Sequence, residues 1–120
     1  MSFQALQVSK RGDAVHAAVV RMQASELMPG DVEVRVDYST LNYKDALAVT
    51  GAAPIVQVFP LVAGIDLAGT VEQSSHPDFA PGDAVLVNGW VLSQTHHGGY
   101  AQRARVRGDW LVRRPPAFDA

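Results

Sequence analysis

Polar side chains gather within residues 38–51, where a hydroxyl, an amide and a phenol occur in four consecutive positions. These groups belong to Thr40, Asn42 and Tyr43. Each of them can both donate and accept a hydrogen bond, so together they can orient a polar substrate. A second interpretation stays open, because Asn42 and Ser39 can also satisfy the unpaired backbone groups of a turn. The segment is therefore a candidate site that the surrounding elements must position.

The residues on either side of this group predict a strand and a short helix. From Asp31 to Asp37 apolar and charged residues alternate, which is the period of a half-buried strand. Residues 44–49 lack Gly and Pro and begin a helical segment that Thr50-Gly51 closes. A side chain at the end of a strand is held by a rigid element and is still accessible, and binding sites are commonly built there.

General acid–base chemistry could use Tyr43, Asp45, Asp66 or His96, and the residue types alone do not rank them. Asp66 lies between two large apolar residues. An ionised carboxylate in such a position needs a hydrogen-bonding or charged partner. We therefore expect Asp66 to be hydrogen-bonded in the folded chain.

The sequence does not predict a metal site. The chain has no cysteine, which excludes both disulfides and thiolate ligands. His96 and His97 are adjacent, so their side chains would point apart and could hardly bind one ion together. A zinc site would need Asp45 or Asp66 to join a histidine from another part of the chain.

Length and composition are typical of one globular domain, with 120 residues, of which 48% are hydrophobic and 18% charged. The net charge of −2 gives no electrostatic reason to expect nucleic acid or an anionic membrane as a partner. The chain does not begin with a basic segment followed by an apolar run, and no apolar stretch approaches about 20 residues. We expect a soluble, cytoplasmic protein without a membrane segment.

Most of the chain has the pattern of short strands separated by turns. Pro-Gly-Asp occurs twice, each time directly before a candidate strand, and Pro and Gly favour the two central positions of a turn. The candidate strands are residues 3–8, 14–22, 31–37, 61–74, 84–87, 100–106 and 110–114. About seven short strands and one helical segment predict a mostly β chain that forms a small antiparallel or mixed β-barrel.

Gly64 and Gly69 lie within one candidate strand and predict close backbone approach, a bulge or a barrel corner. Their spacing does not fit the G-x-G-x-x-G turn of a dinucleotide site, and no helix follows them. Arg103, Arg105 and Arg107 share one side of the last long strand, a pattern more typical of a solvated strand face than of a phosphate site. If a dinucleotide is bound, most of its site lies outside these residues.

Five sequence blocks resemble the N-terminal, GroES-like catalytic domain of the medium-chain dehydrogenase/reductase superfamily. The resemblance is greatest to the zinc-independent quinone oxidoreductases, a branch that includes the NADPH-dependent acrylyl-CoA reductases. It extends from the first candidate strand to Pro116. The blocks are Ser39-Thr-Leu-Asn-Tyr-Lys-Asp45, Pro60-Leu-Val-Ala-Gly-Ile-Asp-Leu-Ala-Gly-Thr-Val-Glu72, Asn88-Gly-Trp90, His97-Gly-Gly-Tyr-Ala101 and Ala104-Arg-Val-Arg-Gly-Asp-Trp-Leu-Val112.

The resemblance implies a GroES-like split β-barrel with one or two short helices, formed by residues 1–116. It also implies that NADPH is held mainly by a separate Rossmann domain, and that residues 117–120 begin the link to it. We expect no turnover without that domain. In zinc-dependent relatives a Cys stands at position 42 and a Gly-His-Glu triplet at residues 64–66, so the resemblance implies no zinc here. One departure is His97, where many relatives carry Trp, and this change could alter the substrate wall.

Asn42, Tyr43 and Asp45 line the active site in this branch, as the resemblance implies. Tyr43 would contact the nicotinamide end of NADPH and would orient the substrate or donate a proton. Asn42 would hydrogen-bond near the nicotinamide or the substrate, and Asp45 would hold the group in place. The implied reaction is hydride transfer to the β-carbon of an enoyl thioester, with a proton delivered to the α-carbon, or reduction of a quinone.

Two expectations concern partners. Apolar surface near Leu47, Val49 and the C-terminal strands would face the Rossmann domain, and its exposure predicts a homo-oligomer. The alternative to an enzyme is a stand-alone GroES-like binding or assembly module that holds a partner with the apolar loop Ile55–Phe59. The polar group at residues 39–45 has no purpose in that alternative.

Overall fold

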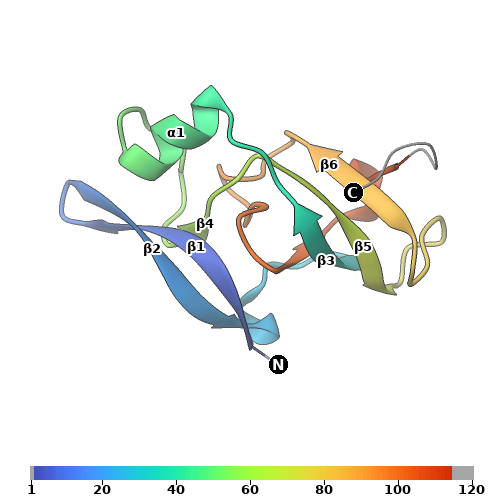
Figure 1. The fold of residues 1–120 in the computed structure, drawn as a ribbon. Coiled ribbons are helices and arrows are strands. Elements are labelled where there is room, and N and C mark those ends of the chain that lie inside the picture. The colour runs from blue at the N-terminus through green and yellow to red at the C-terminus, as the bar shows by residue number, and fades with distance from the viewer. Residues whose placement is uncertain (1, 115–120) are drawn as a thin grey trace.

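The computed structural model describes residues 2–114, which form two antiparallel sheets and one α-helix (Figure 1). The strands are β1 (Ser2–Arg11), β2 (Ala14–Gln23), β3 (Val32–Tyr38), β4 (Leu61–Val62), β5 (Asp66–Ser74), β6 (Ala84–Asn88), β7 (Arg103–Val106) and β8 (Val112–Arg113). The helix α1 spans Tyr43–Thr50, and short 3-10 turns form at Ala24–Glu26 and Gly108–Trp110. This arrangement confirms the predicted mostly β fold.

The first sheet has the strand order β2-β1-β4 and is built on a long hairpin. All ten residues of β1 pair with β2, from Ser2 opposite Gln23 to Arg11 opposite Ala14. Gly12 adopts a positive φ of 59° in the turn between them, which suits the tight turns that hairpins favour. The predicted opening hairpin is confirmed, and α1 packs against its β2 side (Figure 1).

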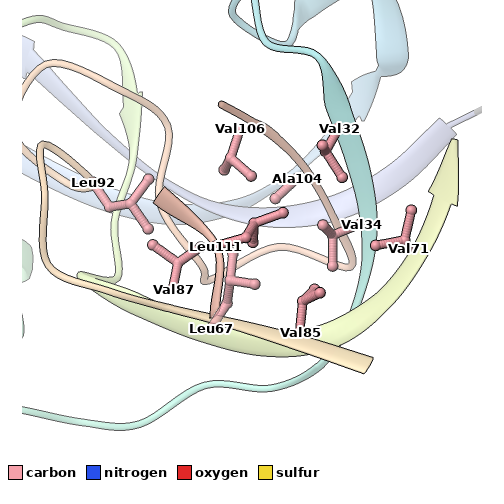
Figure 2. Close-up of a cluster of buried hydrophobic side chains, with 10 residues drawn as sticks. All are labelled: Val32, Val34, Leu67, Val71, Val85, Val87, Leu92, Ala104, Val106 and Leu111. Atoms are coloured by element: carbon pink, nitrogen blue, oxygen red, sulfur yellow. The ribbon is translucent and has the colours of Figure 1, made fainter. Parts of the chain in front are cut away.

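The second sheet has the strand order β7-β3-β5-β6-β8, and its inner face carries the main hydrophobic core. In the first half of β3, along β6 and along β5 as far as Val71, every second side chain is buried, as expected for strands that are covered on one face. Figure 2 shows that these side chains meet Leu92 and Leu111 from the flanking segments. The alternation predicted for residues 31–37 therefore identifies side chains that face the core, Val32 and Val34.

Glycine divides the predicted strand at 61–74 into β4 and β5. Gly64 has a φ of 100°, a conformation that other residues rarely adopt, and the chain turns there between the two sheets. Gly69 lies so close to β3 that an added Cβ would sit 2.3 Å from the Arg35 carbonyl oxygen. Both glycines therefore mark the corner and the close approach that the sequence predicts.

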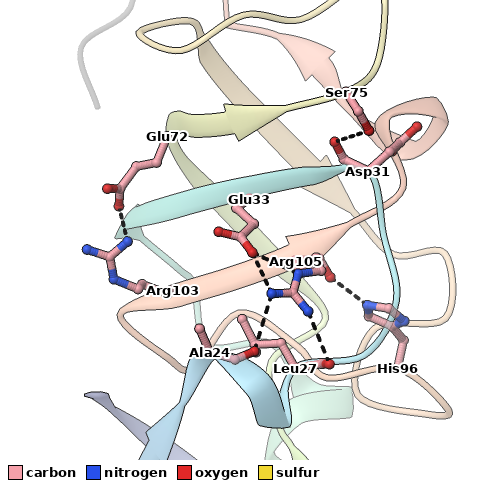
Figure 3. Close-up of polar contacts among 9 residues, drawn as sticks. All are labelled: Ala24, Leu27, Asp31, Glu33, Glu72, Ser75, His96, Arg103 and Arg105. Atoms are coloured by element: carbon pink, nitrogen blue, oxygen red, sulfur yellow. Dashed lines mark hydrogen bonds and ion pairs between the residues drawn. The ribbon is translucent and has the colours of Figure 1, made fainter. Parts of the chain in front are cut away.

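The last strand is shorter than predicted and its arginines are not a solvated row. Only Arg103–Val106 forms β7. Arg103 pairs with Glu72 at 2.7 Å, and the Arg105 Nε donates to Glu33 at 2.9 Å (Figure 3). The Arg105 guanidinium also donates to the Ala24 and Leu27 carbonyl oxygens. It therefore connects the segment between β2 and β3 to the second sheet. Arg105 thus pairs with Glu33 on the neighbouring strand β3, and Arg103 reaches past β3 to Glu72 on β5. Ion pairing rather than solvation accounts for these two of the three arginines.

Apolar surface near α1 also differs from expectation. Leu47 and Val49 are half-buried, and Val49 packs against a cluster that includes Val8 and Leu61. The residues that remain exposed near the helix are Leu41 and Tyr43. Residues 115–120, including the predicted start of a link at 117–120, lie outside the described residues. No helix among the described residues is long and apolar enough to cross a membrane.

We expect Gly69→Ala to lower the free energy of unfolding by more than about 2 kcal/mol, because the added Cβ would meet backbone atoms of β3 that cannot move without breaking the sheet. Gly12→Ala is the matched control. Its site is open, so only the cost of a positive φ remains, about 1 kcal/mol. Urea unfolding of both variants measures the difference, and equal losses would contradict the close approach of β3 and β5.

Candidate active site

The candidate site is built where β3 ends and α1 begins. Asn42 precedes the helix, and Asp45 lies in its first turn, where a negative charge is favourable. The backbone N–H of Asn42 donates to the Asp45 carboxylate at 3.0 Å. Gly51, with a φ of 73°, ends the helix in the left-handed conformation that favours glycine. The helix thus starts one residue earlier than predicted and ends where predicted.

Asp45 is fully buried and is held by three N–H groups. Besides the Asn42 backbone, the Asn42 side-chain amide donates to it at 3.1 Å and the Ile65 backbone N–H donates at 2.9 Å. A buried carboxylate is costly unless its oxygens accept hydrogen bonds, and here both oxygens do. Asp45 therefore joins the start of α1 to the chain just before β5, and no part of it is open to a substrate.

Asp66 is the second carboxylate of the site and accepts hydrogen bonds from the end of β3. The Thr40 hydroxyl donates at 2.7 Å and the Thr40 backbone N–H at 3.2 Å. The Ser39 hydroxyl donates to the Asp66 carbonyl oxygen at 2.8 Å. The expectation that Asp66 is hydrogen-bonded is confirmed, and its partners are the polar residues that the sequence singles out.

Asn42 connects the two carboxylates. Its side-chain nitrogen lies 3.1 Å from an Asp45 oxygen, 3.2 Å from an Asp66 oxygen and 3.0 Å from the Thr40 hydroxyl. Two amide protons are thus surrounded by three acceptors, which leaves the amide one favourable orientation. Asn42 does stand at the turn that begins the helix, as the second interpretation of its role expects. Its side chain also connects the other polar residues of the group.

Tyr100 is a member of this group that sequence reasoning did not assign a role. Its hydroxyl donates to the Thr40 carbonyl oxygen at 2.8 Å. Gly98 and Gly99 bring it there by running against residues 63–66, where an added Cβ would lie 2.1 and 2.0 Å from carbonyl oxygens. The signal in the sequence is the Gly-Gly pair directly before an aromatic residue, because such a pair permits close backbone contact.

Burial, together with the nearby negative charges of Asp45 and Asp66, raises the pKa of Tyr100 to about 12. The phenol is therefore protonated at neutral pH and acts as a fixed hydrogen-bond donor. In this state it holds the Thr40 backbone against the wall of the site.

Two hollows flank the Ser39–Thr40 segment. One, of about 210 Å³, is lined by Asp66 and Asn88 among others. The other, of about 500 Å³, is mostly apolar and includes Leu41, Val49 and Tyr100 in its lining. Tyr43 is 81% exposed and Leu41 is 79% exposed. The hydrogen-bonded group therefore has a rigid inner side and an open outer side.

The structure brings together Thr40, Asn42, Asp45 and Asp66 and leaves His96 elsewhere. His96 is buried, its Nε2 lies 2.7 Å from the Arg105 carbonyl oxygen (Figure 3), and desolvation lowers its pKa. His97 also lies apart from this group. Its Nδ1 accepts a hydrogen bond from the Val62 backbone N–H at 3.0 Å. Within residues 2–114 no group of three or more His, Asp or Glu residues is placed to hold a metal ion.

We expect Asp45→Asn to lower the free energy of unfolding by about 1–3 kcal/mol, because the new amide would point N–H groups at N–H donors in a buried position. Asp78→Asn is the control, since Asp78 lies exposed in a surface turn, and its effect should stay within about 0.5 kcal/mol. Denaturant unfolding measures both. Equal effects would show that Asp45 is not the structural centre of the group.

Tyr100 should make stability fall in alkaline solution. Below pH 10 the folded and unfolded chains both keep this phenol protonated, so it adds no pH dependence. Between pH 10 and about 12 the unfolded chain releases the proton while the folded chain keeps it, so the free energy of unfolding decreases. Unfolding curves of the chain and of Tyr100→Phe across this range isolate the contribution. Parallel pH profiles would contradict it.

Comparison with known proteins identifies the family of the chain and agrees with its fold. The alcohol dehydrogenase GroES-like domain family matches residues 28–116. A probable acrylyl-CoA reductase of Escherichia coli K12 is 48% identical, with 98% of this chain and 36% of that protein covered. A putative quinone oxidoreductase of Bacillus subtilis is 43% identical over 94% of this chain and 34% of its own length.

Among solved structures, E. coli K-12 YhdH with bound NADPH superposes with a TM-score of 0.95 at 48% identity, covering 98% of this chain and 36% of that one. The chain thus spans about a third of the length of the relatives it matches. These similarities place it in the medium-chain dehydrogenase/reductase branch with acrylyl-CoA reductases and quinone oxidoreductases. The chain belongs to the alcohol dehydrogenase GroES-like domain family.

Proposed function

We propose that this chain forms the substrate-facing wall of an NADPH-dependent oxidoreductase that reduces an activated carbon–carbon double bond. The favoured substrate class is an enoyl thioester such as acrylyl-CoA, with a quinone as the alternative. The observation that carries the proposal is the hydrogen-bonded group of Thr40, Asn42, Asp45 and Asp66, which is rigid on its inner side and open beside Tyr43. Such preorganisation is what a site needs to orient a substrate.

The described residues suit one end of the cofactor. The exposed Tyr43 phenol and the hollow beside Thr40, whose lining combines apolar side chains with a few polar groups, can contact a neutral, planar nicotinamide. The Asp66 carboxylate in the lining of that hollow would repel phosphate groups. We therefore infer that a nucleotide-binding domain holds the rest of NADPH. When bound, NADPH supplies the hydride.

Within this proposal the residues of the chain act by orientation and charge stabilisation. Tyr43 donates a hydrogen bond to the substrate carbonyl, or a proton to the α-carbon, because its phenol is exposed at the rim. Asn42 has its amide protons fixed between acceptors, so it keeps the chain next to Tyr43 in one conformation. Asp45 is a positioning residue, since burial keeps it from touching the substrate. A well-placed donor to the developing enolate is worth about 100-fold or more in kcat.

The proposed metal-free chemistry has a structural counterpart at positions 42 and 66. Asn42 donates directly to Asp66 at 3.2 Å, so the two side chains contact one another. A neutral amide and a carboxylate at this distance form a stable hydrogen bond without a cation between them. The substrate carbonyl would then be polarised by hydrogen-bond donors such as Tyr43, and Tyr43 therefore has the central role.

The alternative of a stand-alone binding module is less well supported by the loop on which it depends. Val56 is buried, and Ile55 and Phe59 are half-buried against the body of the domain. The Lys10 ammonium also lies over the Phe59 ring, 5.8 Å from its centre. A loop packed in this way exposes Val58 but otherwise presents little apolar surface to a partner.

Turnover by the chain with and without a family nucleotide-binding domain tests the proposal. NADPH oxidation is followed with acrylyl-CoA and with a quinone, using the chain alone and a fusion to that domain. We expect turnover by the fusion and none by the chain alone, because the chain contacts only one end of the cofactor. Turnover by the chain alone would contradict the proposal, and the preferred substrate of the fusion decides between thioester and quinone.

Tyr43→Phe in the active fusion should lower kcat by about 100-fold, because it removes one donor to the developing negative charge. Val19→Ala is the control, as Val19 is 68% exposed on the hairpin and touches no part of the site. Steady-state kinetics of both variants measure the effect. An unchanged kcat for Tyr43→Phe would remove the phenol from the mechanism.

A further inference from the structure

The outer edge of β2 is an open strand edge of unusual composition. Within residues 2–114, β2 is at the end of its sheet and has a hydrogen-bonded neighbour, β1, on one side only (Figure 1). An edge strand directs every second pair of backbone N–H and C=O groups outward, where another strand can pair with them. Natural edges are usually protected by charged side chains, Pro, a bulge or a covering helix. The end of α1 lies against β2 at Val15, and Arg21 is charged, but residues 16–19 between them contain no Lys, Arg or Pro and no bulge.

The middle of β2 is exposed on both faces of the sheet. His16, Ala17, Ala18 and Val19 are all exposed, and Val19 keeps 68% of its surface accessible. Three of these four side chains are small or apolar, so a neighbouring strand could approach closely and bury them. Nothing in this segment contributes to the candidate active site, so the edge needs an explanation of its own.

We propose that this edge pairs with the same edge of a second copy of the chain, in an antiparallel and symmetric arrangement. A two-fold contact places each residue opposite a position counted from the other end, so the strand must be complementary to itself. With Ala17 at the centre, opposite Ala17 of the second copy, Val15 lies opposite Val19. The small centre and the paired valines satisfy that requirement.

Charge supports this register. With Ala17 at the centre, the exposed Asp13 in the hairpin turn comes opposite the exposed Arg21 of the second copy, and this happens at both ends of the contact. Shifting the centre to Ala18 would instead place Arg21 opposite Val15, and the pairing of charges would be lost. Opposite charges across a strand pair stabilise it, so the first register is favoured.

Two variants test the contact by sedimentation velocity over a range of concentrations. Val19→Lys should shift the chain from dimer to monomer, because a charge on an edge strand blocks pairing. At a low concentration, where the parent chain is also monomeric, the two chains should unfold at similar temperatures. Val112→Lys is the matched control, since Val112 is 58% exposed on the edge strand of the other sheet. It should leave the dimer intact.

The register has its own test by charge exchange. Asp13→Arg and Arg21→Asp should each weaken the dimer severalfold, and the double variant should restore it. Because the chain has no cysteine, Ala17→Cys can also be joined to its copy by a short bismaleimide, whereas Thr95→Cys, exposed in the segment before β7, should link severalfold less. A monomer at high concentration, a dimer insensitive to Val19→Lys, or equal linking at both cysteines would overturn the proposal.

Discussion

The candidate site depends on one buried carboxylate. Asp45 accepts hydrogen bonds from the start of α1 and from the backbone just before β5, and these two segments belong to different parts of the chain. Because a buried charge must keep its partners, the end of β3, the helix and the first residues of β5 cannot move independently. Every other polar contact of the site is arranged around this fixed junction.

The fold supplies the junction through close backbone contacts. Gly64 turns the chain between the sheets, and Gly98 and Gly99 run against the same corner so that the Tyr100 hydroxyl reaches Thr40. Asn42 then connects Asp45 to Asp66 and leaves Tyr43 on the open side. Rigid support beneath an accessible phenol is the arrangement that substrate orientation requires. The β2 edge contacts no part of this site, and we propose a separate role for it as a contact between two copies of the chain.

Much of this was predictable from the sequence, and the misses have physical causes. The alternation at residues 31–37 and the Thr50-Gly51 helix end follow local rules, so both are reproduced. The spacing of Gly64 and Gly69 predicts close approach, a bulge or a corner, but the division of residues 61–74 into two strands depends on a φ that no pattern specifies. The pairing of Arg103 with Glu72 and the contact of Tyr100 with Thr40 join residues far apart in the chain, and residue types alone do not reveal such partners. For Tyr43 the exposure is visible, while its role stays a proposal.

Hydrogen exchange at the Ile65 backbone amide is the most direct test of the central claim that Asp45 fixes the site. That amide donates to the Asp45 carboxylate at 2.9 Å and lies between β4 and β5, outside both sheet ladders. We expect this amide to exchange as slowly as the amides of the core strands, because its hydrogen bond opens only when the junction breaks. Exchange as fast as in the exposed hairpin turn would show that the junction is mobile and that Asp45 does not fix the site.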